Sequence, residues 1–114
     1  MNFKVNLSPE FQRDLDDIWT HIVEEYMNPD ATERITDGIL GTAQKLETFP
    51  LSGKKISLPG GMDSGYRFLL FENYIIVYRI QPDLVQVARV VHSALDYMRV
   101  MFPRLKRKPL DEDD

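Results

Sequence analysis

The sequence predicts an α+β (α/β) domain in which an N-terminal strand and an antiparallel helical hairpin pack on an antiparallel β-meander. In the first half, apolar residues recur at helical spacing in two consecutive segments; in the second half, three alternating segments are separated by two-residue turns. The length of 114 residues, with 43% hydrophobic and 28% charged residues, fits one globular domain. We expect this domain to span residues 1–103 and residues 104–114 to form a charged, mobile tail.

The first half begins with a strand and a capped helix. Residues 2–7 alternate polar and apolar side chains, which is typical of a half-buried strand. Ser8 then suits the N-cap of a helix and Pro9 its first position. The apolar stripe of this helix consists of Phe11, Leu15, Ile18, Trp19, Ile22, Val23 and Tyr26. Asn28 and Pro29 are predicted to end it.

A second helix follows closely, so the two helices are expected to pack as an antiparallel hairpin. Asp30 and Glu33 form the pattern of a capping box. The stripe of this helix consists of Ile35, Ile39, Ala43 and Leu46. Gly38 and Gly41 each weaken a helix by about 1 kcal/mol relative to alanine. Their presence predicts a close approach to the first helix or to the sheet.

The second half is predicted to form the meander. Residues 51–65 contain four glycines and one proline and are expected to form a long loop. The three strands that follow are predicted at Tyr66–Phe71, Tyr74–Gln81 and Leu84–Val91. Ser93 suits the N-cap of a short C-terminal helix, whose apolar residues are Leu95, Met98, Val100, Met101 and Phe102.

The charges are segregated along the chain, although the net charge is only −4. Residues 1–50 carry ten acids and four bases, whereas residues 51–110 carry four acids and ten bases. A basic half on an acidic chain suggests an anionic partner, either nucleic acid or an acidic protein. The alternative is that the helices only solvate their outer faces with acids.

Composition excludes several classes of site. The chain has no cysteine, so a disulfide framework, a thiolate zinc site and a cysteine nucleophile are excluded. Phosphate-binding glycine loops, zinc-protease histidine pairs and serine nucleophile elbows are also missing from the sequence, and we expect neither a cofactor nor a metal. Residues 1–7 lack the apolar core of a signal peptide, and no apolar run approaches the roughly 20 residues of a membrane span. These features predict a cytoplasmic protein.

Two groups of polar residues are candidates for chemistry. The first is an acidic helix face, which we expect to be solvated, with His21 and the carboxylates Asp14, Asp16, Asp17, Glu24 and Glu25. The second places one arginine on each meander strand: Arg67, Arg79 and Arg89. Among them lie the aromatic residues Tyr66, Tyr74, Tyr78, His92 and Tyr97.

The strand register decides between two interpretations of the second group, and the pattern does not fix the register. Arginines interleaved with aromatic rings can bind RNA through phosphate contacts and stacking. Alternatively, the tyrosines are core residues and the arginines are ordinary ion-pair partners. Metal-free RNA cleavage would need a cation, such as Arg67 or Arg89, and an acid or base, such as His92 or Tyr97.

The chain as a whole resembles the RelE/ParE superfamily of bacterial toxins from type II toxin–antitoxin pairs. The resemblance covers roughly residues 3–102 and includes the first strand ending in S-P-E-F, the hairpin, and F-P-L-S-G-K-K after the second helix. It continues with Y-R-F-L-L-F-E-N-Y-I-I-V-Y-R-I and V-A-R-V-V-H-S-A-L-D-Y. It implies a growth-arresting toxin that is neutralised by a cognate antitoxin, whose acidic or amphipathic segment docks on it in a hetero-oligomer.

The resemblance implies two activities. RelE-like members cut messenger RNA on the ribosome with a basic cluster on the sheet, whereas ParE-like members inhibit DNA gyrase. Arg67 matches the arginine of the Tyr-Arg pair of the superfamily. Leu69 and the segment 92–94 (His-Ser-Ala) stand where the RNA-cutting members often have basic residues. The segment 89–92 followed by Asp96 and Tyr97 resembles the ParE-type ending.

Three hypotheses follow. The first is a plasmid-stabilising type of toxin that inhibits gyrase without being an enzyme; the residues expected to bind the target or the antitoxin are Arg79, His92, Met98, Met101 and Phe102. The second is a metal-independent, ribosome-dependent messenger RNA endonuclease, with the catalytic residues Arg67, Arg89 and Tyr97. The third is a non-toxic binding module that retains the fold.

Overall fold

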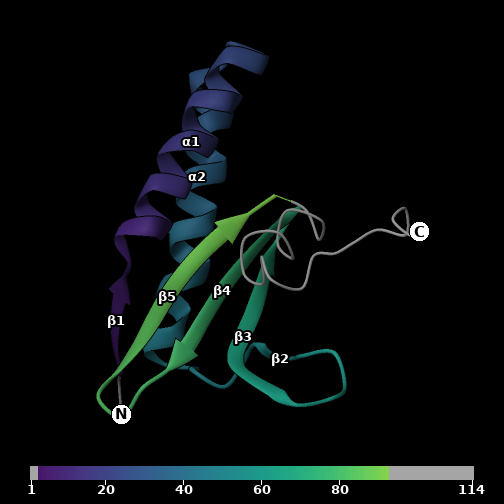
Figure 1. Ribbon diagram of the computed structural model, residues 1–114. Coiled ribbons are helices and arrows are strands. Elements are labelled where there is room, and N and C mark those ends of the chain that lie inside the picture. The colour runs from purple at the N-terminus through teal and green to yellow at the C-terminus, as the bar shows by residue number, and fades with distance from the viewer. Residues whose placement is uncertain (1–2, 93–114) are drawn as a thin grey trace, which may run out of the picture.

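The computed structural model describes residues 3–92 and consists of a helical hairpin packed on a five-stranded sheet (Figure 1). The elements in chain order are β1 (Lys4–Leu7), α1 (Pro9–Tyr26), α2 (Pro29–Gln44), the 3₁₀ helix η1 (Lys45–Glu47), β2 (Lys54–Ser57), β3 (Asp63–Phe71), β4 (Tyr74–Ile80) and β5 (Leu84–Val91). The α+β class is confirmed. The predicted C-terminal helix and the predicted tail lie outside the described residues.

The sheet has the strand order β1-β5-β4-β3-β2. The pairs among β2, β3, β4 and β5 are antiparallel, as the meander prediction requires. β1, however, pairs in parallel with β5, with Val5 opposite Val85. The sheet is therefore mixed. The sequence prediction gave the N-terminal strand no partner, because the local sequence of β1 carries no record of the distant strand with which it pairs.

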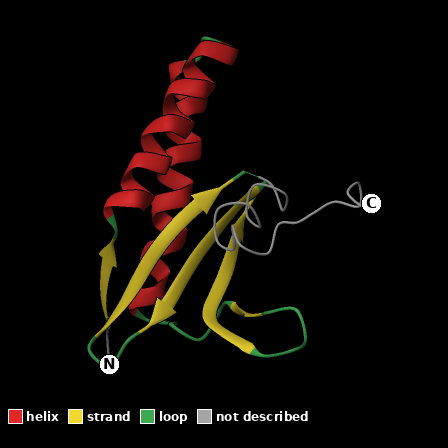
Figure 2. Ribbon diagram, viewed as in Figure 1, coloured by secondary structure: helices red, strands yellow, loops and turns green. Residues whose placement is uncertain are grey.

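Both helices lie against one face of the sheet, and the hairpin extends past the end of the strands (Figure 2). The core between the two layers contains Phe11, Ile39, Leu46, Ile76, Tyr78 and Val87, all fully buried. The predicted stripe of α1 continues beyond the sheet, where Trp19 is 43% and Tyr26 64% exposed.

The predicted start of the first helix is confirmed. The Ser8 side chain accepts a hydrogen bond from the backbone N–H of Phe11, and Pro9 occupies the first turn. The predicted capping box of the second helix was wrong. Asn28 is the N-cap, and its side chain accepts hydrogen bonds from the N–H groups of Asp30 and Ala31. Pro29 therefore opens this helix, because proline is tolerated in the first turn where no N–H is required.

Part of the segment predicted as a long loop forms strands. β2 lies within this segment, and β3 begins in it at Asp63; the two strands pair with Lys54 opposite Phe68 and Ser57 opposite Asp63. The turn between them, residues 58–62, contains Gly60 and Gly61 with positive φ. The glycines thus mark a hairpin turn rather than an extended irregular loop. No helix within residues 3–92 is long and apolar enough to cross a membrane.

Candidate functional site

The register places the three sheet arginines on two different faces. Arg67 lies opposite Tyr78, which faces the helices. Arg89 lies opposite Val77, which alternates with Tyr78 along β4, and it therefore starts on the outer face of the sheet, away from the helices. Arg79 also lies on the outer face, opposite Gln86. The structure therefore separates Arg67 from the other two arginines.

Arg67 is held by the loop that connects η1 to β2. Its Nη1 donates a hydrogen bond of 2.8 Å to the backbone carbonyl of Gly53 and lies 3.5 Å from that of Leu51. Tyr78 holds the same loop: its hydroxyl donates to the carbonyl of Pro50 and accepts from the N–H of Gly53. Burial raises the pKa of Tyr78, and the hydrogen bond from Gly53 partly offsets this rise. Tyr78 is thus a core residue with a bonded hydroxyl group, and Arg67 supports the loop.

Arg89 is bound to Asp14 of α1 through both ends of its guanidinium group. The Nε and Nη2 atoms donate to the two carboxylate oxygens at 2.7 and 2.8 Å. The same carboxylate accepts the backbone N–H of Val90 at 3.1 Å, so Asp14 also caps the edge of β5 beyond the end of β1. The hydrogen bond to Asp14 raises the pKa of Arg89, although burial opposes this rise. The positive charge of Arg89 is therefore largely compensated within the chain.

Arg79 is exposed and lies over a tyrosine ring. Its guanidinium carbon is 5.7 Å from the centre of the Tyr66 ring, within the range of a cation–π contact. Both side chains line a cavity of about 300 Å³, together with Ser8, Glu10, Gln86, Ala88 and Arg89. This cavity is the place where two of the predicted site residues, Arg79 and Arg89, meet. The cavity offers cations and an aromatic ring to an anionic ligand, and its wall also contains the carboxylate of Glu10.

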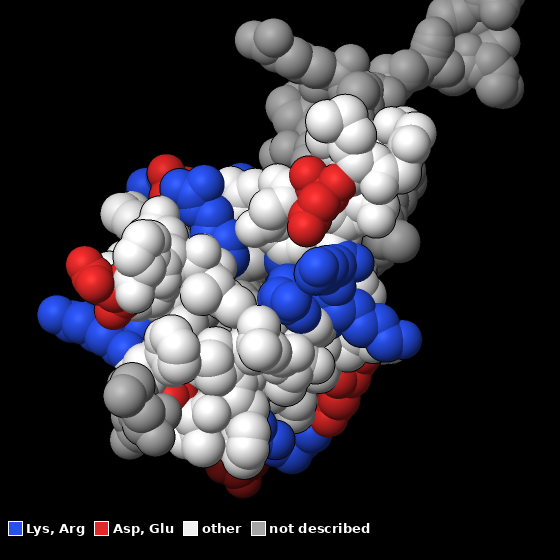
Figure 3. All heavy atoms as spheres, turned by 90° about the horizontal axis from the view of Figure 1, so that it is seen from below, with Lys and Arg blue, Asp and Glu red and all other residues white. Residues whose placement is uncertain are grey.

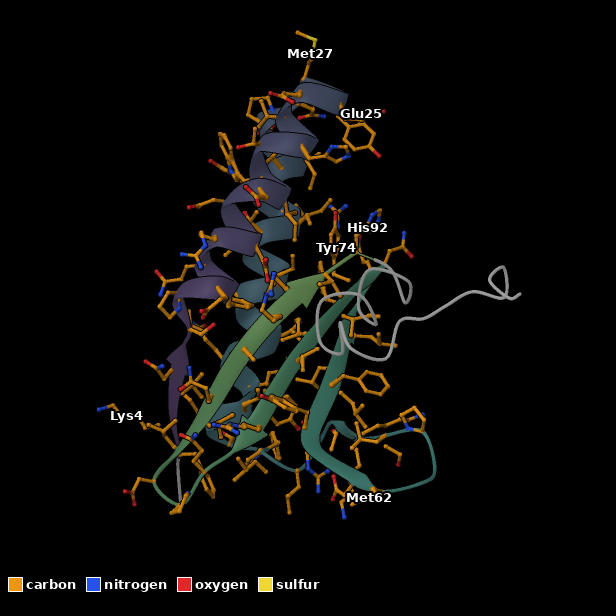
Figure 4. All side chains as sticks on the ribbon, viewed as in Figure 1. Lys4, Glu25, Met27, Met62, Tyr74 and His92 are labelled. Atoms are coloured by element: carbon orange, nitrogen blue, oxygen red, sulfur yellow. The ribbon has the colours of Figure 1, made fainter. Side chains whose placement is uncertain are left out.

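His92 lies away from these arginines, at the end of the sheet that faces the projecting hairpin (Figure 4). Its ring stacks on Tyr74 with the centroids 5.0 Å apart. Both rings line another cavity of about 370 Å³, whose walls include His21, Tyr26 and the ion pair between Arg34 and Glu72. Burial raises the pKa of Tyr74, and the nearby Tyr26 and Glu72 raise it further. His21 lines this cavity and is exposed, as the sequence suggested.

The remaining predicted residues are Tyr97, Met98, Met101 and Phe102, and all four lie outside the described residues. Within residues 3–92, no three acidic or histidine side chains are arranged to hold a metal ion.

Sequence reasoning missed the structural role of Asp14. It was grouped with the solvated acids, yet its side chain is only 13% exposed. The signal was present, because Asp14 follows Phe11 by three residues and precedes Ile18 by four, which places it on the buried stripe. Glu10 and Gln86 were also missed as cavity residues. No local signal identifies them, because the cavity forms only when β5 lies beside the start of α1.

A comparison with protein families shows which family the chain matches. The family model described as the ParE toxin of the type II toxin–antitoxin system, parDE, matches residues 5–97. The chain belongs to this family. No curated protein sequence matches the chain.

Solved structures agree with the ParE assignment at the level of the fold. A chain of the chromosomal ParDE system of P. aeruginosa has a TM-score of 0.66 and 19% identity, and the match covers 80% of this chain and 96% of that one. A chain of the RelBE2 toxin–antitoxin complex of Mycobacterium tuberculosis has a TM-score of 0.59 and 23% identity, covering 81% and 99%. A chain of the E. coli DinJ–YafQ toxin–antitoxin complex has a TM-score of 0.54 and 15% identity, covering 90% and 99%. This ParE-family chain thus has the fold of RelE/ParE toxins.

Proposed function

We propose that this toxin of a type II toxin–antitoxin module arrests growth by inhibiting DNA gyrase through a protein–protein contact. The observation that carries the proposal is the engagement of two sheet arginines by the chain itself: Arg89 by Asp14, and Arg67 by the carbonyl of Gly53. A cation that stabilises a phosphorane must face the phosphate at the moment of reaction. Arg89 is instead paired with Asp14, and Arg67 lies on the other face of the sheet, so the two guanidinium groups do not face one phosphate together.

The acid–base groups of the described part of the chain also support a non-hydrolytic toxin. General acid–base catalysis is most efficient when the pKa of the group lies near the working pH. The pKa values of Tyr74 and Tyr78 are shifted upward, away from neutrality. His92 is stacked on Tyr74 rather than placed beside the arginines. We therefore propose His92 and Arg79 as residues that contact a protein, together with Met98, Met101 and Phe102.

Messenger RNA cleavage is the second candidate, because one cavity favours it. Arg79, Arg89 and the ring of Tyr66 line the same space of about 300 Å³, which offers cationic and stacking contacts to a nucleotide. In this alternative, Tyr97 supplies the acid or base, and Arg67 and Arg89 stabilise the charge.

We also propose a cognate antitoxin as the partner that neutralises the toxin in a hetero-oligomer. The excess of bases in the second half of the chain favours an acidic or amphipathic antitoxin segment.

The experiment is to induce the chain alone in a bacterial host and to follow incorporation of labelled thymidine and labelled methionine over the first minutes. Early failure of DNA synthesis with chromosome breaks supports gyrase inhibition. Early failure of protein synthesis supports messenger RNA cleavage and contradicts the proposal. Normal growth at a confirmed level of folded protein would instead support a non-toxic module.

Variants separate the two activities further. We expect Arg89→Ala and Tyr97→Phe to retain gyrase inhibition in proportion to the fraction of protein that remains folded. If a folded Tyr97→Phe variant loses all growth arrest, messenger RNA cleavage is favoured.

A further inference from the structure

A rigid loop presents two large apolar side chains at the end of the molecule opposite the hairpin tip. Phe49 and Leu51, in the connection between η1 and β2, are 62% and 66% exposed. Their backbone is nevertheless fixed, because Tyr78 bonds the carbonyl of Pro50 and the N–H of Gly53. A Cβ at residue 53 would lie 2.6 Å from the Tyr78 hydroxyl and 2.7 Å from the carbonyl oxygen of Phe68, so only glycine fits.

Two more apolar side chains are exposed near this loop. Met62, at the tip of the β2–β3 hairpin, is 70% exposed and lies at the same end of the molecule (Figure 4). Ile80, at the end of β4, is 36% exposed and lines a cavity of about 210 Å³ with Lys55, Asp63, Gly65, Tyr66 and Arg67. Arg67 connects this cavity to the loop through its contact with the carbonyl of Leu51. We call the exposed residues Phe49, Leu51, Met62 and Ile80, together with Lys54, Lys55 and Arg67, the basal surface.

The basal surface carries uncompensated positive charge. The two hydrogen-bond acceptors of Arg67 are neutral carbonyl groups, so its charge is not neutralised by them. Lys55 approaches Asp63 only at 3.9 Å, and both side chains are more than half exposed, which makes this pair weak. Seen from this end, charged side chains of both signs, several of them lysine and arginine, border a broad uncharged area (Figure 3).

We propose that the basal surface binds an acidic protein segment, with a carboxylate in the cavity between Lys55 and Arg67 and apolar side chains against Leu51 and Phe49. The inference rests on the proposed function, according to which the acidic segment belongs to gyrase. Charge complementarity selects the acidic partner. The exposed leucine, methionine and isoleucine favour protein over nucleic acid, because aliphatic side chains offer no stacking surface for bases.

The fixed loop makes such a contact efficient. Binding costs less when the contacting groups are already ordered, because less conformational entropy is lost. Tyr78 and Arg67 order the loop before any partner arrives. The basal surface therefore combines the two features expected of an energetic centre: exposed apolar anchors on a rigid backbone, and adjacent cations that orient the partner.

The test compares purified toxin variants in gyrase binding and in inhibition of DNA supercoiling. The double variant Leu51→Asp, Lys55→Glu keeps the backbone contacts of the loop. It replaces an exposed apolar side chain and a positive charge of the basal surface by two negative charges. We expect a loss of gyrase affinity of about tenfold or more. The matched control is Met27→Asp, an equally drastic change at the 82% exposed hairpin tip, which should retain affinity. Thermal unfolding of each variant verifies that it is folded, and Phe49→Ser replaces the double variant if that one is not.

The outcomes are distinct. Wild-type affinity in the folded basal variant overturns the basal surface but leaves gyrase inhibition intact. Absence of gyrase binding by the wild-type toxin overturns the proposed function and this inference together. Binding of gyrase-free DNA by the wild-type toxin that is abolished in the basal variant would show a nucleic-acid site and overturn a protein partner.

Discussion

At the scale of single residues, Asp14 connects the first helix to the last described strand. Its carboxylate accepts three hydrogen bonds, two from Arg89 and one from the backbone of Val90. It therefore neutralises the partly buried charge of Arg89 and accepts a hydrogen bond from a backbone N–H at the edge of β5 that has no strand partner. This dual role predicts that the residue matters for stability even if it never contacts a partner.

We expect Asp14→Ala to lower the free energy of unfolding by about 2 kcal/mol, because it leaves a partly buried guanidinium and a strand N–H unpaired. The value is below that of a fully buried pair because Arg89 is 29% exposed. Urea unfolding measures the change, and Asp16→Ala on the exposed side of the helix is the control. Equal stability of the two variants would contradict the structural role of Asp14.

The buried tyrosines predict a loss of stability at alkaline pH. The pKa values of Tyr74 and Tyr78 are raised in the folded protein, so the unfolded chain releases these protons first. Their contribution is complete below the unfolded pKa of about 10 and disappears as the pH rises through the folded values. Unfolding measured between pH 8 and 11 should show this decline.

Tyr78→Phe should make the decline shallower and should cost about 1–3 kcal/mol at pH 8, because the N–H of Gly53 loses its partner. Tyr66→Phe serves as the control, because it removes a different hydroxyl and leaves the buried hydroxyl of Tyr78 in place. A decline of the same steepness in Tyr78→Phe would show that other groups cause it.

At the scale of elements, Gly38 explains how closely α2 approaches the sheet. A Cβ built at this position would lie 2.0–2.6 Å from ring atoms of Phe71 on β3. Gly41, one turn further along the helix, has no atom within 4 Å of such a Cβ. The predicted reason for the glycines, a close approach to the sheet, therefore applies to Gly38 and not to Gly41.

The two glycines make a matched pair of tests. Gly38→Ala should destabilise the protein by about 1–2 kcal/mol, because the clash with Phe71 exceeds the gain in helix propensity. Gly41→Ala should stabilise it by about 0.5–1 kcal/mol, because the space is free and alanine restricts the unfolded chain. Thermal unfolding of both variants checks the opposite signs. A stabilised Gly38→Ala variant would mean that the Phe71 ring moves aside at little cost.

The elements also show how far the sequence alone could lead. Helices and hairpin strands are local structures, so spacing and turn residues predicted α1, α2, β3, β4 and β5 correctly in kind. β2 was missed because its four residues lie among glycines and become a strand only by pairing with β3. Which of the arginines share a face of the sheet could not be predicted from the sequence either. The register shift between Val77 and Tyr78 helps decide which arginines share a face, and side-chain patterns do not reveal such a shift.

At the scale of the whole molecule, acids predominate on the hairpin and bases on the sheet. The hairpin, residues 9–44, carries nine acids and two bases, whereas residues 54–91 carry five bases and three acids. A molecule with this asymmetry approaches an acidic partner with its sheet end first. The segregation noted in the sequence thus becomes a directional property of the fold.

This asymmetry predicts salt-dependent association. The rate constant for binding gyrase should fall by about tenfold when sodium chloride rises from roughly 50 to 300 mM, because the ions screen the long-range attraction. Dissociation should change much less. Lys54→Gln combined with Lys55→Gln should reduce the salt dependence, whereas Asp16→Asn on the hairpin should leave it nearly unchanged. Surface plasmon resonance measures both rates, and an identical salt dependence in the lysine variant would exclude steering by this end.

The parallel pairing of β1 with β5 also sets an order of events during synthesis. Residues 4–7 leave the ribosome early, but their partner strand, residues 84–91, is made some 77 residues later. At about 5–20 residues per second, this separation corresponds to roughly 4–15 s. During that interval the sheet cannot close and Asp14 has no arginine to bind. A nascent chain therefore lacks the pairing of β1 with β5 and the ion pair between Asp14 and Arg89 until β5 emerges.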